Sequence, residues 1–215
     1  MTPDAPIGMF DSGFGGLTVA RAVIDLLPHE NLVYIGDTGR YPYGNKPADE
    51  VRRYARELAH SLVEDYGAKM IVVACNTAAS VALTDLQAEL DVPVVGVVEP
   101  GARALVRVTH NNKVGVIGTV GTISSGAYVE AVRATGANVT LTSAACPGFV
   151  EFVERHPGHD VYFVNPHRVE PRPFTGIWQQ AEVHHPGIIG LAQRIFDQVG
   201  VAVDLATLEQ PREQV

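Results

Sequence analysis

A cysteine at the junction of a predicted strand and a predicted helix is the residue of this sequence best placed to do chemistry. Cys75 follows the apolar run at residues 70–74 and precedes a helical pattern at 77–90, with Asn76 and Thr77 beside it. In open α/β sheets ligands bind at the carboxyl ends of strands, and the positive end of a helix dipole favours a thiolate over a thiol. We therefore expect Cys75 to have a lowered pKa. A buried structural cysteine is the alternative, and the spacing alone does not choose between the two.

Two more polar loops follow predicted strands. The glycine-rich segment at residues 11–16, which contains Asp11 and Ser12, follows the strand predicted at 7–10. Its glycines would let a carboxylate or phosphate approach the N–H groups of a helix N-terminus, although a tight structural turn is the alternative. Its spacing matches neither a dinucleotide-binding fingerprint nor a P-loop. A third loop contains the segments Gly36-Asp37-Thr38 and Tyr41-Pro42-Tyr43-Gly44, which are suited to binding or to turn formation alone.

The elements that must position these loops alternate between strands and helices. Apolar periodicity predicts strands at residues 7–10, 32–35, 70–74, 92–98 and 114–117, and helices at 17–27, 49–66 and 77–90. Such alternation favours parallel βαβ units wound into an open, helix-covered sheet. Residues 114–120 also resemble residues 7–13. That similarity agrees either with an internal duplication or with the features shared by all βα units.

Composition narrows the class of protein. The chain has 215 residues, of which 46% are apolar and 19% charged, so it can form one large α/β domain or two small ones. A net charge of −8 argues against a nucleic-acid scaffold or a binder of anionic membranes. We expect no signal peptide and no membrane span. Two cysteines, Cys75 and Cys146, are too few for a disulfide scaffold, so the cytoplasm is the expected compartment.

Together the three loops are similar to the motifs of glutamate racemases. The matching segments lie within residues 6–154, at 10–19, 36–38, 41–44, 74–78, 115–119 and 146–154. The resemblance implies an α/β fold of two similar open parallel-sheet domains that face each other across an active-site cleft. We expect the first domain at residues 1–98 and the second at 99–215.

The resemblance also implies a two-base racemisation of glutamate without a cofactor or a metal. One cysteine thiolate removes the Cα proton and a second thiol protonates the opposite face. Cys75 would be one base, assisted by Asp11. The substrate would be held by Asp11, Ser12, Tyr43, Gly44, Asn76 and Thr77. The D-glutamate produced would feed peptidoglycan synthesis in a bacterial cytoplasm. Glutamate is the expected partner, with no nucleic acid and no membrane, and a homodimer is left open.

The second catalytic cysteine of that family is missing here. It normally lies in a Gly-Cys-Thr-His-Tyr-Pro loop, and the nearest segment of this chain, residues 181–186, has Glu182 at the cysteine position. The internal similarity gives the same alignment, because Cys75 lies 67 positions after Gly8 and Glu182 lies 67 positions after Gly115.

By the resemblance, His184 matches the histidine that assists the second thiol, and Glu154 matches the acid that supports that histidine. However, residues 177–181 are a poor candidate for a buried strand, and a base must be held firmly near its proton. Four explanations stay open: a carboxylate base in a natural variant, a damaged sequence, a protein that only binds, and a one-thiol isomerase or decarboxylase.

The sequence is atypical of the family from about residue 155. Three prolines in residues 166–173 predict an extended loop and no sheet, with order returning at 187–204. In the family, the C-terminal part of the chain usually returns to complete the first domain. We expect this part to be lacking here. Cys146 is expected to be structural. A metal site is disfavoured because these histidines lack a tight ligand spacing: His156, His159, His167, His184 and His185.

Overall fold

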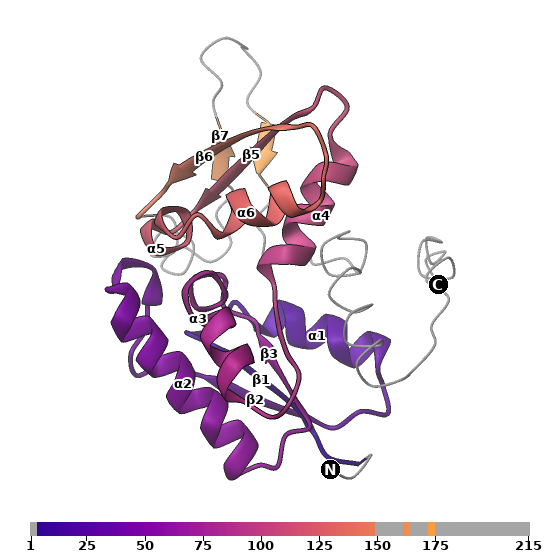
Figure 1. Cartoon of the computed structure of the whole chain (residues 1–215), viewed down its shortest axis with the longest axis vertical. Helices are drawn as coiled ribbons and strands as arrows, with labels where there is room; N and C mark the ends of the chain where they lie inside the picture. Colours follow the sequence, from indigo (N-terminus) through magenta and orange to yellow (C-terminus); the bar gives the residue numbers. More distant parts are fainter. Residues whose placement is uncertain (1–3, 149–160, 164–171, 175–215) are drawn as a thin grey trace.

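The computed structural model describes residues 4–148, 161–163 and 172–174, and it begins with a four-stranded parallel sheet (Figure 1). Hydrogen bonds join the strands in the order β2-β1-β3-β4, where the strands are β1 (Ile7–Asp11), β2 (Leu32–Gly36), β3 (Met70–Val73) and β4 (Val94–Gly96). The central strand β1 pairs with β2 through Ile7 and Leu32, and with β3 through Ile7 and Met70. The strand order reverses between β1 and β3. Ligands of such sheets bind beyond the carboxyl ends of the strands at that reversal.

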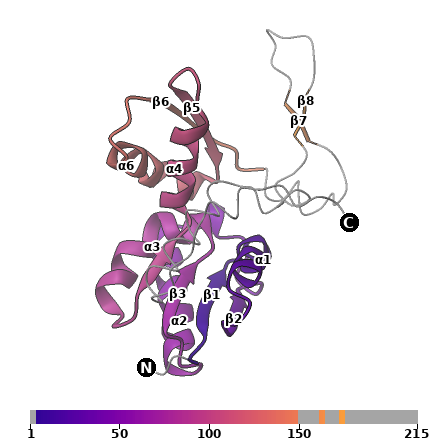
Figure 2. The ribbon, with the colours of Figure 1, turned by 90° about the vertical axis from the view of Figure 1, so that its right-hand side faces the viewer.

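Helices cover both faces of this sheet (Figure 2). Helix α1 (Leu17–Leu26) lies on one face, and α2 (Ala48–Glu64) and α3 (Asn76–Glu89) lie on the other. Successive side chains of a strand point to opposite faces, so Met9 packs with the α1 side and Phe10 with the α2 and α3 side. The residues of β1, β3 and β4 are buried throughout, which is why these strands are continuous apolar runs in the sequence.

A second, smaller sheet follows helix α4 (Val98–Val108). In the described residues it has two parallel strands, β5 (Lys113–Gly118) and β6 (Thr140–Ala145), with α5 (Val120–Ser124) and α6 (Ala127–Ala134) between them in sequence. Most side chains of β6 are exposed. The buried side chains of the described residues lie mainly in residues 7–98. Beyond that range they are Pro100, Ala102, Ala104, Val116, Thr122 and Val132.

The predicted strands and helices agree with the structure to within a few residues, with one exception in the first sheet. The strand predicted at 92–98 ends at Gly96, and Val98 is the first residue of α4. Val98 is buried as a helix residue, and an apolar run alone does not distinguish a strand end from a buried helix start. Helices α4 and α6 and strand β6 were not predicted.

The prediction of a loop without sheet at residues 166–173 is wrong at its end. Strand β8 (Arg172–Phe174) pairs antiparallel with β7 (Val161–Phe163), and Pro173 lies opposite Tyr162. A proline, which lacks an N–H group, is tolerated in an edge strand, and each strand of a two-stranded pair has an outer edge. The order predicted at 187–204 and the five histidines from His156 onward lie outside the described residues.

No helix in the described ranges has the length and apolar character needed to cross a membrane.

Candidate active site

The three predicted loops meet at one edge of the first sheet. Asp11 ends β1, Gly36 ends β2 and Cys75 follows β3, so parallel pairing brings all three to the carboxyl ends of neighbouring strands. The Cys75 thiol donates to the Ser12 hydroxyl across 3.5 Å between Sγ and Oγ, although the two residues are 63 positions apart. Two of the three predicted loops are therefore in direct contact.

Cys75 begins helix α3 as its N-cap. Its backbone is extended, with φ −83° and ψ 119°, and its Sγ accepts the backbone N–H of Ala78 at 3.5 Å. The side chain is almost fully buried, with 5% exposure. The sulfur thus occupies the position that a Ser or Asp oxygen takes at many helix starts.

Burial and, less strongly, the negative charge of Asp11 raise the pKa of Cys75 to about 11. The Ser12 hydroxyl and the Ala78 N–H lower this pKa, but by less. The prediction of a lowered pKa is therefore wrong, because the loss of solvation and the neighbouring carboxylate outweigh the helix terminus. The thiol is therefore the dominant form of Cys75 at pH 7 in the ligand-free protein.

Asp11 is buried and binds its own loop. Its Oδ2 accepts the backbone N–H groups of Gly13 at 3.3 Å and Gly16 at 2.9 Å. A Cβ atom on Gly16 would lie 2.8 Å from the Asp11 Cβ, so this close turn requires a glycine there. These two N–H groups are therefore bonded within the loop, as expected for a tight structural turn, which was the alternative to anion binding at this segment.

The partly buried carboxylate of Asp37 fixes the third loop. The Tyr43 hydroxyl donates to Asp37 Oδ2, and Arg40 Nε donates to the same oxygen at 2.6 Å. Tyr43 is 1% exposed, and burial together with its hydrogen bond to Asp37 raises the pKa of its hydroxyl above the usual value. The hydroxyl is therefore neutral and acts as a donor within the protein, which places Tyr43 and the adjacent Gly44 firmly.

The substrate residues predicted on α3 contact the second half of the described chain. Thr77 Oγ1 lies 2.9 Å from Thr119 Oγ1 and 3.4 Å from Thr122 Oγ1. The Tyr128 hydroxyl donates to Asn76 Oδ1 at 2.8 Å. These hydrogen bonds join the start of α3 to the α5 and α6 region.

Gly44 also contacts this region. It belongs to the short helix η1 (Tyr43–Asn45), and a Cβ atom built on it would lie 2.5 Å from Thr119 Cγ2. The two segments approach this closely because position 44 has no side chain.

Thr119, Thr122 and Tyr128 were not among the predicted site residues. Thr119 could have been predicted, because in the similarity between residues 7–13 and 114–120 it occupies the position equivalent to Ser12. Thr119 caps α5 by accepting the Thr122 N–H at 3.2 Å, just as Cys75 caps α3. Nothing in the sequence pattern indicates that Tyr128 reaches Asn76.

His184 lies outside the described residues. Cys146 follows β6, is half-buried, and its Sγ lies 3.9 Å from the Ala144 carbonyl oxygen. Both cysteines are free thiols. Within the described ranges, no three His, Cys, Asp or Glu side chains are grouped as metal ligands.

Known proteins have sequences similar to this chain. The family model for Asp/Glu/hydantoin racemases matches residues 18–167. The chain belongs to this family. A glutamate racemase of Corynebacterium diphtheriae is 48% identical over 194 residues, which are 88% of this chain and 72% of that protein. The resemblance to glutamate racemases is confirmed.

Solved structures of this racemase family agree with the fold. The glutamate racemase isoform RacE1 of Bacillus anthracis has a TM-score of 0.68 and 45% identity, over 71% of this chain and 57% of that one. The Francisella tularensis glutamate racemase, crystallised with D-glutamate, has a TM-score of 0.67 and 35% identity, over 74% and 60%. The predicted α/β fold class is confirmed. This chain spans less than two thirds of either solved structure.

Proposed function

We propose that the chain interconverts L- and D-glutamate without a cofactor, with Cys75 as one of two proton-transfer groups. The observation that carries this proposal is the position of Cys75 at the strand reversal of a parallel sheet, hydrogen-bonded to Ser12 and close enough to Asp11 for that charge to raise its pKa. The family membership and the glutamate racemases among its relatives support the substrate.

The raised pKa suits Cys75 to this reaction. A thiolate of higher pKa is a stronger base, and the Cα proton of an amino acid is hard to remove. The ammonium group of a bound glutamate beside Asp11 would offset the negative charge that disfavours the thiolate. We therefore propose that Asp11 assists Cys75 by holding the ammonium group, so that the base is generated when substrate is present.

The reaction removes one proton from one face of Cα and delivers another proton to the opposite face. The Cys75 thiolate takes the Cα proton from one enantiomer and becomes a thiol, and the electron pair left behind delocalises into the substrate carboxylate. A second group then gives its proton to the opposite face, which inverts the centre. We propose Glu182 for that group, assisted by His184 and Glu154, on the sequence alignment alone.

The remaining substrate contacts are proposed at the same edge of the sheet. Ser12 is the hydroxyl that touches the Cys75 sulfur. The hydroxyl groups of Tyr43 and Thr77 are engaged within the protein. We therefore assign their backbone N–H groups, with those of Gly44 and Asn76, to the substrate carboxylates. N–H groups in the first turn of a helix have no partner within that helix and favour anions.

Circular dichroism of L-glutamate incubated with the purified chain tests the proposal. The signal is expected to decay to zero with the wild-type protein and to stay flat with Cys75→Ser. Cys146→Ser is the matched control and is expected to behave as wild type. A flat signal from a folded wild-type protein would refute the racemase proposal.

Deuterium exchange at Cα in heavy water identifies the number of bases. A two-base enzyme incorporates deuterium with inversion, so label enters the product enantiomer. Deuterium entering L-glutamate without inversion would indicate one-thiol chemistry, and an absence of exchange would indicate a protein that only binds.

We further propose that the reaction supplies D-glutamate for peptidoglycan in the cytoplasm, and that the chain forms a homodimer. Light scattering coupled to size-exclusion chromatography measures the second point. A mass near 23.0 kDa would contradict a dimer.

A further inference from the structure

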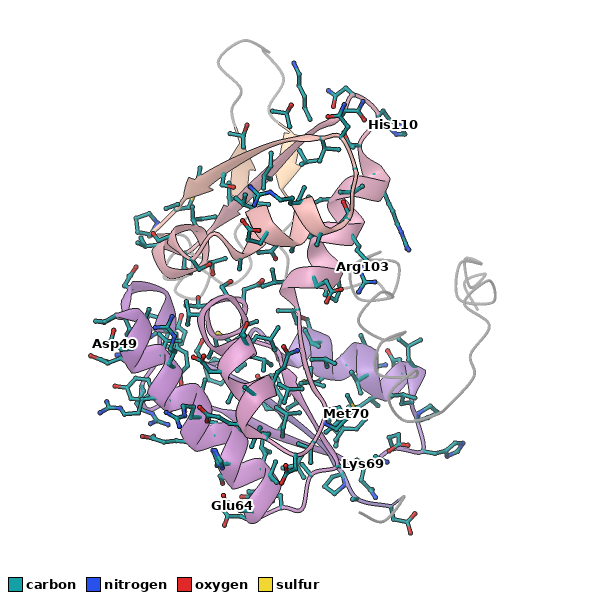
Figure 3. The ribbon with its side chains drawn as sticks, viewed as in Figure 1. Asp49, Glu64, Lys69, Met70, Arg103 and His110 are labelled. Atoms are coloured by element: carbon teal, nitrogen blue, oxygen red, sulfur yellow. The ribbon has the colours of Figure 1, made fainter. Side chains whose placement is uncertain are left out.

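Tyr128 of α6 lies where three helices of the described chain meet (Figure 1). Its ring packs against the core on the α2 and α3 side of the first sheet. Its hydroxyl donates to Oδ1 of Asn76, the first residue of α3, at 2.8 Å and across 52 positions of sequence. A Cβ atom on Gly101 of α4, two residues before the Arg103 labelled in Figure 3, would lie 3.1 Å from the same hydroxyl oxygen. The hydroxyl therefore lies between α4 and the start of α3.

The Tyr128 hydroxyl is a donor that keeps its proton. Burial raises the pKa of Tyr128 to about 12, so the hydroxyl is neutral at pH 7. The side-chain amide of Asn76 has its oxygen and its nitrogen on one planar carbon, and only the oxygen can accept. A hydrogen bond to Oδ1 therefore also sets the direction in which Nδ2 points.

The other end of the Asn76 amide is available. Asn76 is exposed, and no residue of the described chain accepts a hydrogen bond from its Nδ2. The residue directly follows Cys75, the proposed base. An N–H donor forms its stronger hydrogen bonds with a charged acceptor, and glutamate has two carboxylates. The amide is therefore suited to bind the substrate beside the thiol.

We propose that Tyr128 is a positioning residue of the active site, whose hydroxyl holds the Asn76 amide so that Nδ2 donates to a carboxylate of bound glutamate. This inference rests on the proposed racemase function for its substrate. It gives α6, in the second half of the described chain, a role in substrate binding at the edge of the first sheet. The carboxylate is present in both enantiomers and in the transition state, so the contact acts on affinity and leaves kcat nearly unchanged.

Calorimetric titration of the full chain with DL-glutamate, whose composition racemisation does not change, measures this affinity. Tyr128→Phe keeps the ring and removes the hydroxyl. We expect its dissociation constant to rise about threefold to tenfold, with kcat from circular dichroism within about twofold of wild type. Tyr54→Phe is the matched control, because it removes a hydrogen bond of 2.9 Å to Glu50 within α2 and is expected to leave both values unchanged.

A double-mutant cycle separates positioning from a general structural role. Asn76→Ala is expected to weaken binding by about tenfold or more, because a hydrogen bond to a carboxylate is lost. Adding Tyr128→Phe to Asn76→Ala should then change the dissociation constant by less than about twofold, because no amide is left to position. Equal weakening by Tyr128→Phe with and without the Asn76 amide would overturn the proposal, as would wild-type affinity in Tyr128→Phe.

Thermal unfolding without ligand reports the folding of each variant. If Tyr128→Phe does not fold, Gly101→Ala decides the result. Its new Cβ atom presses on the Tyr128 hydroxyl from α4 and should raise the dissociation constant about twofold or more, so an unchanged value would overturn the proposal. A wild-type protein that does not bind glutamate would overturn it as well. A wild-type protein that binds glutamate without racemising it would refute the racemase function alone.

Discussion

Adding one methyl group at Gly44 should disturb the contact between η1 and Thr119. The new Cβ atom would lie 2.5 Å from Thr119 Cγ2 and 2.7 Å from Thr119 Cβ, which is closer than side chains approach. Thr119 has little freedom to move away, because its hydroxyl bonds to those of Thr77 and Thr122. Gly44→Ala must therefore shift the η1 loop or α5.

The expected loss follows from this clash. Overpacking of a fitted contact costs about 1–3 kcal/mol, while the reduced freedom of the unfolded chain returns about 0.4–1 kcal/mol. We expect Gly44→Ala to lower the free energy of unfolding by about 1–2 kcal/mol in urea denaturation, and to lower kcat/KM for glutamate as well. Gly39→Ala is the matched control, because no atom lies within 4 Å of the Cβ position there.

A double-mutant cycle isolates the contact. Thr119→Ser removes the Cγ2 methyl group that meets the new side chain, so the loss in Gly44→Ala/Thr119→Ser should be smaller than the sum of the single losses by about 0.5 kcal/mol or more. The reasoning is refuted if Gly44→Ala and Gly39→Ala unfold at the same urea concentration, or if the two substitutions at 44 and 119 are additive.

Three further substitutions probe the site and the core. The pKa of Cys75 rises from 9.0 to about 11 on folding, so its contribution to stability is complete below pH 9 and is lost as the pH approaches 11. Wild type should lose about 2–3 kcal/mol more than Cys75→Ser over that interval in urea denaturation. Tyr43→Phe, which removes the hydrogen bond from a buried side chain to the Asp37 carboxylate, should cost about 1.5–3 kcal/mol by the same assay. Leu62→Ala, at a fully buried position of α2, should cost about 2–5 kcal/mol in thermal unfolding.

Matched variants define the outcomes that would contradict these expectations. Cys146→Ser should follow the wild-type pH dependence, and a parallel loss in Cys75→Ser would show that the thiol at 75 does not cause it. Tyr66 is 51% exposed, so Tyr66→Phe should stay within about 0.5 kcal/mol of the stability of the wild type. If Tyr43→Phe costs no more than Tyr66→Phe, the hydrogen bond from Tyr43 to Asp37 does not stabilise the fold as expected. Leu17 is 49% exposed, and Leu17→Ala should cost far less than Leu62→Ala.

The first sheet was predictable because both of its faces are buried. A strand covered on both sides must be apolar throughout, and β1 and β3 have that pattern in the sequence. The strand predicted at 92–98 was too long for the same reason, since Val98 is equally apolar as the first residue of a buried helix. An apolar run therefore shows that residues are buried more reliably than it shows whether they form a strand or a helix.

The electrostatics of the site were not predictable from local pattern. The helix N-terminus at Cys75 suggested a lowered pKa, but the degree of burial and the position of Asp11 depend on how distant segments pack. The contact between Thr77 and Thr119 joins residues 42 positions apart and leaves no periodicity in the sequence. Such pairs became visible only in the folded chain.

The uneven distribution of buried side chains gives the described chain two levels of local stability. Amides of β1 and β3 lie in the interior of a covered sheet, so their hydrogen exchange requires opening of the whole core. Amides of β6 lie beside mostly exposed side chains and should exchange through smaller openings. During synthesis, the segment up to residue 98 already contains most of this core, so it can collapse into its sheet while the second half is still being made.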